Sequence, residues 1–408
     1  MRSDKGRCRA IIQFHKPAAL DMLSYPTLVI KGAASSPVTL ELSDAIGEQS
    51  VPLGHMSGRF DQRLPLTPVM RRLDPTHVTT LVIETEAGHA TFTLEAFSIE
   101  RASTAESPGS RKGFWMWDYQ RAVADPDSLI RECSRAGATR LLVQIPHGDD
   151  PPDIWAAYAE LLRQISSSGL EVFALDGYPE AIYDPSPLIE KVKRLRSLLV
   201  DEQWTGLQLD IEPYLLDRFS DPHDYDLYLQ VIEQMRRALG DRIRLSIVMP
   251  FWFSDKIARE RPLAFQIMNR VDEVAVMSYR TDLEELEDIT EPLLRYGDAV
   301  GVPVWLAVET RPLPVDRQVT LVRARRSTEA TAYLDRHGRR LVLAPPPPDQ
   351  TERFRVAHRI TIRPERLTFA GKTRSDLHSA LTTILAIPHK SLAGVLIHDI
   401  DGYLSLTE

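Results

Sequence analysis

The chain has 408 residues, 43% of them hydrophobic and 26% charged, so it can bury a full core and favours two domains over one. Its formal net charge of −8 argues against a nucleic-acid partner, because no basic surplus is available to replace counterions on phosphates. The two cysteines, Cys8 and Cys133, lie far apart, so neither a disulfide framework nor a cysteine metal cluster is expected.

No apolar run in the sequence is long enough to span a bilayer, so no transmembrane helix is expected. The first residues lack the continuous apolar region of a secretory signal. The sequence as written therefore predicts a cytoplasmic protein, and export would require a signal in a longer chain. The oligomeric state stays open.

Residues 1–100 are expected to form an all-β sandwich, because short β-rich runs alternate with Gly, Pro and Ser at sandwich spacing. The clearest runs are 27–32, 37–44, 79–85 and 90–100. Their order resembles the jelly-roll modules that accompany carbohydrate-active catalytic domains. Sugar binding and a purely structural role both stay open for this domain. Residues 101–112 are polar and rich in Ser, Pro and Gly, which predicts a linker.

From residue 113 to 408, short apolar runs alternate with amphipathic helical stretches, which is the signature of repeated βα units and a parallel sheet. The expected strands are 113–118, 140–146, 170–177, 206–213, 244–251, 273–280, 303–310 and 394–401. Eight such strands predict an α/β fold of the (β/α)8 TIM-barrel type. A return to period-two alternation at about 311–372 predicts a β-rich insertion after the seventh strand.

The fourth expected strand carries an unusual pair of acids. Alternation puts its leucines and Ile211 on one face and Gln208, Asp210 and Glu212 on the other. A buried parallel strand is ordinarily apolar on both faces, and an unpaired carboxylate in a protein interior is expensive. Pro213 then ends the strand, so the acids are expected at the C-terminal end of the barrel, where such barrels keep their chemistry. An edge strand with a wet polar face is the alternative.

Other polar and aromatic side chains are expected at the same end of the barrel. They stand at or near the C-terminal ends of the expected strands: Asp118, Gln144, Asp176, Tyr178, Tyr214, Trp252, Tyr279, Arg280, Glu309, His398 and Asp399, with Trp115 and Trp117 nearby. Aromatic rings beside hydroxyl-binding groups suit a groove for sugars. Taken singly, the aromatic residues and His398 could equally be core residues.

The sequence predicts no cofactor and no metal site. The histidines show no ligand spacing, and no phosphate-binding or dinucleotide-binding loop stands in a usable context. Two or three carboxylates at a barrel end without a cofactor favour glycoside hydrolysis, in which one acid protonates the leaving oxygen. The expected partner is therefore a polysaccharide or oligosaccharide.

The run TGLQLDIEP resembles the fourth-strand signature D-x-x-D-x-D-x-E of glycoside hydrolase family 18, the chitinase-like barrels. Asp210 and Glu212 match its last two acids, while Thr205 and Gln208 occupy the first two positions. The run VMSYR is similar to the family's M-x-Y-D through Tyr279, with Arg280 in place of the acid. His398 stands where that family has a Trp.

The resemblance implies that Glu212 is the general acid, that Asp210 orients a substrate acetamido group and that Tyr279 donates a hydrogen bond to that group. A second scheme makes Glu309, at the end of the seventh strand, the nucleophile of a retaining glycosidase. A barrel that binds polysaccharide without cleaving it, or that scaffolds polysaccharide assembly, is the alternative to an enzyme.

Overall fold

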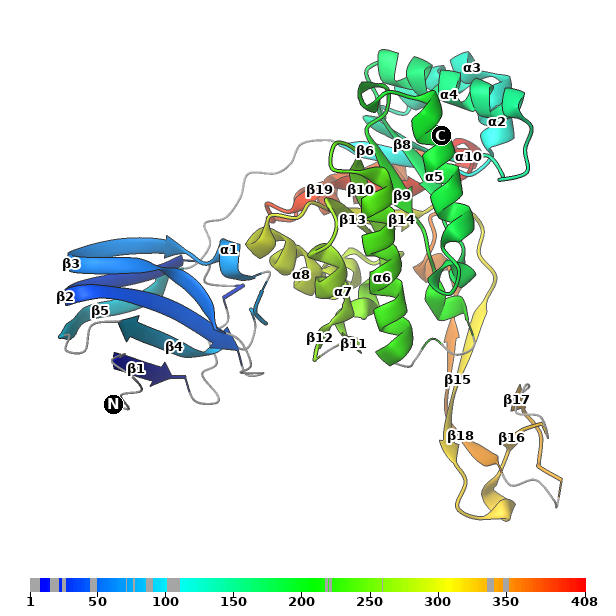
Figure 1. Ribbon diagram of the computed structural model, residues 1–408. Helices are drawn as coiled ribbons and strands as arrows, with labels where there is room; N and C mark the ends of the chain where they lie inside the picture. The colour runs from blue at the N-terminus through cyan, green and yellow to red at the C-terminus, as the bar shows by residue number, and fades with distance from the viewer. Residues whose placement is uncertain are drawn as a thin grey trace.

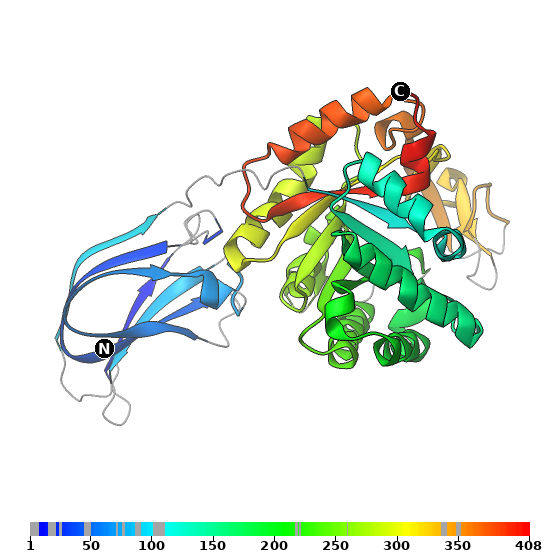
Figure 2. The ribbon, with the colours of Figure 1, turned by 90° about the horizontal axis from the view of Figure 1, so that it is seen from above.

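The structure is a computed structural model, and it describes residues 8–14, 22–23, 27–44, 50–70, 72–75, 78–85, 91–100, 111–216, 219, 222–258, 260–335, 341–347 and 352–408. The chain forms an N-terminal antiparallel sheet, a closed barrel and a β-rich arm that leaves the barrel (Figure 1). Seen from above, the sheet and the arm lie on opposite sides of the barrel (Figure 2). The expected linker falls almost entirely outside the described residues.

The N-terminal domain is one five-stranded antiparallel sheet in the order β1-β4-β2-β3, with β5 paired to β2. Its strands are β1 (Cys8–Gln13), β2 (Thr27–Asp44), β3 (Val51–Pro65), β4 (Val78–Thr85) and β5 (Phe92–Glu100). The first half of β2 pairs with β5 and its second half with β4, while β3 runs along both halves. In the described residues a single curved sheet thus stands in place of the two facing sheets expected for a jelly roll.

The length and bend of β2 explain this difference. Its register with β3 shifts between Ala34 and Val38, around Pro37, which lacks a backbone N–H for the ladder. Side chains nevertheless alternate between buried and half-buried on both sides of the shift. One strand therefore supplies the core of both halves. The domain meets the barrel through Asp44, which accepts a hydrogen bond at 3.0 Å from Arg261.

The barrel contains eight parallel strands in the closed order β10-β13-β14-β19-β6-β7-β8-β9, so the predicted TIM barrel is confirmed. Its strands are β6 (Lys112–Met116), β7 (Arg140–Gln144), β8 (Glu171–Asp176), β9 (Gly206–Leu209), β10 (Arg244–Pro250), β13 (Glu273–Met277), β14 (Val304–Glu309) and β19 (Leu392–His398). Most of them end earlier than expected from the sequence. The acids of the fourth strand therefore lie just beyond β9.

Helices surround the barrel and cover the outer face of its strands (Figures 1 and 2). The α-helices of this region are α2 (Tyr119–Ala124), α3 (Pro126–Arg135), α4 (Pro152–Ser167), α5 (Ser186–Leu198), α6 (Pro222–Leu239), α7 (Leu263–Met268), α8 (Leu283–Val300), α9 (Arg374–Leu385) and α10 (Ile400–Ser405). Short 3₁₀ turns follow several strands, among them η1 (Pro179–Ile182), η3 (Pro213–Leu215) and η4 (Phe251–Ser254). No helix in the described ranges is long and apolar enough to cross a membrane.

Charged side chains fill the N-terminal end of the barrel interior. Arg140 is 0% exposed and bonds to Glu171 at 2.8 Å and to Glu273 at 3.1 Å, with its guanidinium over the rings of Phe173 and Trp305. Buried cations need such partners, because an uncompensated one would be strongly destabilising. Above this layer an apolar interior cluster closes the barrel, so it is packed and not a pore.

A histidine links two other elements at this end of the barrel. His389, in the loop after α9, contacts Asp298 through Nδ1 at 2.7 Å and Glu291 through Nε2 at 2.8 Å, and both carboxylates belong to α8. Burial lowers the pKa of His389, but the hydrogen bonds and charges of these carboxylates outweigh it, and the pKa lies above the usual 6.5.

The arm is a four-stranded antiparallel sheet between β14 and α9, in the order β15-β18-β16-β17. Its strands are β15 (Asp316–Arg323), β16 (Ala332–Leu334), β17 (Leu341–Val342) and β18 (Arg353–Ile362). The pair of β15 and β18 forms a long ribbon that carries the two short strands at its tip, away from the barrel (Figure 1).

Candidate active site

The segment from β9 to η3 places two carboxylates at the C-terminal end of the barrel. Leu207, Leu209 and Ile211 are buried against the surrounding helices. Gln208, on the opposite face, lies inside the barrel and accepts a hydrogen bond at 2.5 Å from the indole N–H of Trp115. Alternation therefore directs the acids that follow Gln208 toward the barrel axis.

Asp210 has a buried carboxyl oxygen. Its Oδ1 is shielded from solvent and has no hydrogen-bond partner among the described residues. Burial, followed by the negative charge of Glu212, raises the pKa of Asp210 from 3.8 to about 7, against the opposing effect of His398. An orphaned buried oxygen is rare in a folded protein and needs an explanation, such as a proton or a substrate group.

The backbone of Asp210 can lie this close to the end of β8 because the neighbouring residue there is Gly177, which has no side chain. A Cβ atom on Gly177 would come within 2.2 Å of the Asp210 carbonyl oxygen. The Asp210 N–H also donates to the Asp176 carbonyl at 2.9 Å, so the β8–β9 pairing continues beyond the strand ends. A larger residue in place of Gly177 would push the acid-bearing segment away.

Glu212 is half-buried and accepts a hydrogen bond from the hydroxyl of Tyr214. Burial and the negative charge of Glu212 raise the pKa of Tyr214, so its hydroxyl stays neutral and donates. The Tyr214 ring packs edge-on against Trp252, with centroids 5.4 Å apart, and against Phe253. These contacts fix the orientation of the Glu212 carboxylate.

Tyr279, just beyond β13, lies at the same C-terminal end of the barrel. Its ring centroid is 6.2 Å from that of His398. Burial and then the charges of Glu309, Asp210 and Glu212 raise the pKa of Tyr279 far above its usual value. Tyr279 is thus a neutral hydroxyl beside the acid pair, suited to donate a hydrogen bond to a ligand.

His398 connects the ends of three strands. Its Nδ1 is 2.8 Å from Glu309 Oε2, and its Nε2 is 2.9 Å from the indole nitrogen of Trp117. Because an indole N–H can only donate, Nε2 accepts and Nδ1 carries the hydrogen that is donated to Glu309. Burial lowers the pKa of His398, but the hydrogen bond and charge of Glu309 outweigh it, and the net shift is upward.

Glu309 is already fully bonded. Its Oε1 accepts hydrogen bonds from the backbone N–H groups of Thr310, at 2.8 Å, and Arg311, at 2.6 Å, while Oε2 faces His398. The residue is only 3% exposed. Glu309 therefore orients His398 and is not open to a ligand.

Several expected site residues have other roles. Asp118 is exposed and caps the N-terminus of α2 by accepting from Arg121 N–H at 2.9 Å. Asp399 caps α10 and is held by Arg311 at 2.9 Å. Both carboxylates are thus bound to the protein itself.

Arg280 is tied to the protein too, through Glu285 at 2.7 Å. Tyr178 donates its hydroxyl to the Asp184 carbonyl at 3.1 Å, and Gln144 is half-buried at the end of β7.

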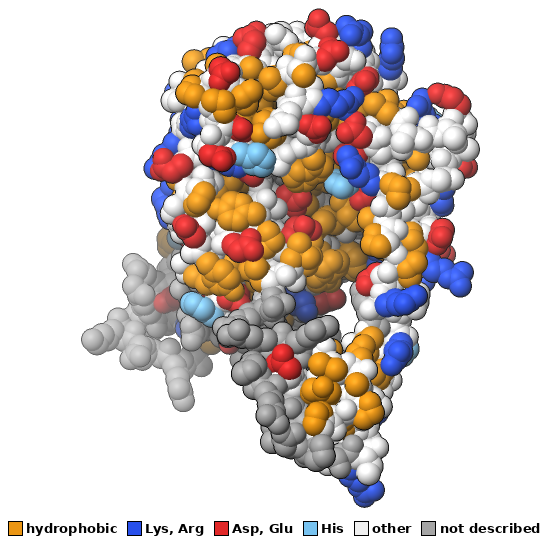
Figure 3. Space-filling model, turned by 90° about the vertical axis from the view of Figure 1, so that its right-hand side faces the viewer, with side chains coloured by type: hydrophobic (Ala, Val, Ile, Leu, Met, Phe, Trp, Pro, Cys, Tyr) orange, Lys and Arg blue, Asp and Glu red, His pale blue; other side chains and the backbone are white. Residues whose placement is uncertain are grey.

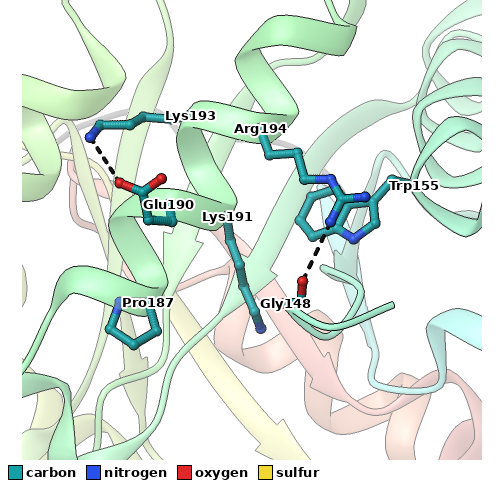
Figure 4. Close-up of a pocket in the computed structure, with 7 residues that line it drawn as sticks. All are labelled: Gly148, Trp155, Pro187, Glu190, Lys191, Lys193 and Arg194. Atoms are coloured by element: carbon teal, nitrogen blue, oxygen red, sulfur yellow. Dashed lines mark hydrogen bonds and ion pairs between the residues drawn. The ribbon is translucent and has the colours of Figure 1, made fainter. Parts of the chain in front are cut away.

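Asp176 faces the outside of the barrel, contrary to expectation. Its inward neighbours are Phe173 and Leu175, so Asp176 points toward the helices and pairs with Lys191 of α5 at 2.8 Å. Lys191 lines a pocket of about 560 Å³ between α4 and α5, where Arg194 lies over Trp155 (Figure 4). This pocket lies on the side of the barrel and does not belong to the site.

Trp117, expected near this end of the barrel but without an assigned role, is bonded to His398 in the site. Trp117 donates its indole N–H to His398 and so sets the tautomer of that histidine. The sequence indicates its inward direction through the spacing of Trp115 and Trp117, which places both indoles on the inward face of β6 and its extension. Among the described residues no group of His, Cys, Asp and Glu could hold a metal ion.

Figure 3 shows one face of the molecule with a hollow lined by hydrophobic and acidic side chains and a histidine.

No family model and no curated protein matches the sequence. Similar solved structures include the spore cortex-lytic enzyme SleL of Bacillus cereus, at 10% identity over 77% of this chain and 74% of that one, with a TM-score of 0.38. A chitinase of Rhizomucor miehei shares 15% identity over 71% of this chain and 95% of that one, with a TM-score of 0.38. A chitinase of Chromobacterium violaceum shares 12% identity over 72% and 96%, with a TM-score of 0.39.

At such low identities and TM-scores the likeness carries no weight for the chemistry of this chain. The site is therefore interpreted from its own geometry.

Proposed function

We propose that this protein is a glycoside hydrolase acting on a polysaccharide or oligosaccharide, with Glu212 as general acid and Asp210 as its partner. The observation that carries the proposal is the acid pair at the open end of the barrel, in which Asp210 keeps a buried, unpartnered oxygen. Burial and Glu212 raise the pKa of Asp210 to about 7, so this pair of neighbouring carboxyl groups holds a proton near neutral pH, which an acid-catalysed cleavage needs.

The proposed chemistry follows what the chitinase-like resemblance of the motifs implies for these residues. Glu212 donates its proton to the leaving glycosidic oxygen as the bond to the anomeric carbon breaks. The acetamido oxygen of an N-acetyl sugar attacks that carbon, while Asp210 accepts the acetamido N–H and Tyr279 donates to the acetamido oxygen. Glu212 then removes a proton from the water that opens the cyclic intermediate. Trp252 and Tyr214 offer ring faces to the sugar.

The bonding of Glu309 supports this substrate-assisted scheme over nucleophilic attack by Glu309. A nucleophilic carboxylate must approach the anomeric carbon. Both oxygens of Glu309 already accept hydrogen bonds, and the side chain is 3% exposed. Glu309 is instead a positioning residue that acts through His398.

The test is hydrolysis of a panel of oligosaccharides with and without N-acetyl groups, using Glu212→Gln, Glu309→Gln and, as matched control, Asp118→Asn. Loss of the general acid is expected to lower kcat by about 100-fold or more. Glu309→Gln is expected to lose less, and sugars without the acetamido group are expected to be inert. Full activity of Glu212→Gln would refute the assignment. Tight glycan binding with no turnover by the unmodified protein would favour the non-catalytic alternative.

A further inference from the structure

The arm carries a charge opposite to that of the rest of the chain. Residues 316–366 contain twelve arginines and six acidic residues, which gives the arm a formal charge of +6. The whole chain carries −8, so the residues outside the arm carry −14. The sequence alone favours a solvated surface for its basic cluster at 323–326. The structure adds that the arm is a ribbon extending away from the barrel (Figure 1).

Most described guanidinium groups of the arm have no partner. Arg323 pairs with Glu352 at 3.7 Å, and Arg366 pairs with Glu285 at 2.7 Å. Six others are exposed and make no side-chain hydrogen bond or ion pair within the described residues: Arg317, Arg325, Arg326, Arg355, Arg359 and Arg363. Free cations are thus concentrated on one projecting element.

Two of these arginines face the same side of the ribbon. Arg317 lies opposite Thr361 and Arg359 lies opposite Val319, so the two arginines are diagonal neighbours, roughly 7–8 Å apart. Half-buried Val319 and Leu321 continue this face toward the tip. Like charges so placed repel each other unless an anion lies between them.

The base of the arm is fixed beside the candidate active site. Its outgoing strand begins a few residues after Glu309, and its returning strand leads to Thr368, which forms a β-bridge with Glu309. The Arg366 carbonyl accepts from Thr281 N–H at 2.9 Å, two residues beyond Tyr279. Both ends of the arm are therefore held at the opening that contains the acid pair.

We propose that the arm binds an acidic polysaccharide and guides it to this opening, so that the substrate of the proposed hydrolase carries carboxylate groups. Arginine forks bind carboxylates in bidentate fashion. Val319, opposite Arg359, and Leu321 add an apolar surface on the same face that suits the C–H face of a sugar ring. A polymer in which uronic acids alternate with N-acetyl sugars satisfies both the arm and the acid pair. This inference rests on the proposed function, because the bound polymer is a substrate only if the protein is a glycoside hydrolase.

The arm is poorly suited to nucleic acid. Single strands are held by stacking bases on exposed aromatic rings. The only aromatic residues of residues 316–366 are Tyr333 and Phe354, and both are half-buried.

The test is native electrophoresis of the full chain in gels containing hyaluronan, polygalacturonate or uncharged dextran. Arg317→Glu/Arg359→Glu is compared with Arg131→Glu/Arg237→Glu, which makes the same change in charge at exposed positions of α3 and α6. The unmodified chain and the control pair are expected to be retarded by both acidic polymers and not by dextran. The arm pair is expected to bind at least tenfold more weakly, and retardation is expected to weaken with added salt.

Three results would overturn the proposal. The first is equal retardation of the arm pair and the control pair, and the second is equally strong retention by single-stranded DNA. The third is a dimer in sedimentation that the arm pair abolishes, with no retention by either polymer, which would assign the arm to a second copy of the chain.

Glu212→Gln keeps the two proposals separate. It is expected to be retarded normally while losing turnover. If the unmodified chain is retained by the acidic polymers but hydrolyses no glycan, the hydrolase proposal is refuted and the binding role of the arm stands. If it hydrolyses neutral glycans only and is not retained, the hydrolase proposal stands and the binding role of the arm is refuted.

Discussion

Replacing Asp210 with Asn tests the central electrostatic claim about the site. Burial and Glu212 raise the pKa of Asp210 from 3.8 to about 7. The difference between these two pKa values corresponds to about 4 kcal/mol against the ionised form in the folded protein. Asn keeps the shape of the side chain and cannot ionise, so it removes this penalty.

The sign of the effect follows from the direction of the shift. Below pH 3.8 the carboxyl group is protonated in both the folded and the unfolded chain, so Asp210→Asn should change stability little. Between that pH and about 7 the unfolded chain loses the proton first, and the unmodified protein loses stability as pH rises. Above about pH 7 the variant should be more stable by about 4 kcal/mol.

Urea unfolding followed by tryptophan fluorescence at pH 4, 6 and 8 measures this difference. The control is Asp118→Asn, because Asn also caps a helix and Asp118 is exposed. A stability gain for Asp210→Asn that is the same at pH 4 and pH 8 would refute the reasoning, as would an equal pH dependence in the control. The same variant should hydrolyse glycans far more slowly, so stability and activity should change in opposite directions.

Three further changes test other contacts. Tyr214→Phe removes the donor to Glu212 and should lower kcat/KM roughly tenfold to hundredfold with little change in Tm, measured on the best oligosaccharide and by circular dichroism. Glu273→Gln leaves the buried guanidinium of Arg140 undercompensated and should reduce the free energy of unfolding by about 3 kcal/mol, measured in urea; an unchanged midpoint would contradict the pairing. Contacts of His389 with the two α8 carboxylates should stabilise the protein fully below pH 6.5, and this contribution should be lost as pH rises through the raised pKa. The stability lost in His389→Gln should therefore shrink from pH 6 to pH 9.

The barrel and the inward direction of the acid pair follow from the sequence because both depend on local patterns. Short apolar runs between amphipathic helical stretches predict the strands, and in the fourth strand Leu207, Leu209 and Ile211 leave only one face for Asp210 and Glu212. The N-terminal domain was harder to predict. Nothing local shows that β2 passes through a bend and pairs with two different strands on one side.

The prediction for Asp176 is wrong because it used the position of the residue along the strand and not the face of the strand on which the residue lies. Asp176 ends β8, but the inward residues of that strand are Phe173 and Leu175, so its carboxylate pairs with Lys191 outside the barrel. Contacts between residues far apart in the sequence also cannot be predicted from local patterns. The bond between Trp117 and His398 joins the first strand to the last, and only closure of the barrel brings them together.

The neutral Gln208 gives the site its particular electrostatics. It stands where the chitinase-like pattern has an acid, and its amide bridges Trp115 Nε1, at 2.5 Å, and Ser246 Oγ, at 2.9 Å. With no charge below it, Asp210 owes its raised pKa first to burial and then to Glu212. Two other buried carboxylates at this end, Glu309 and Asp399, are bound to His398 and Arg311. Among the described residues, the buried carboxyl oxygen without a hydrogen-bond partner at this end of the barrel is Oδ1 of Asp210. A proton that the charge of Glu212 helps to retain is therefore expected on Asp210.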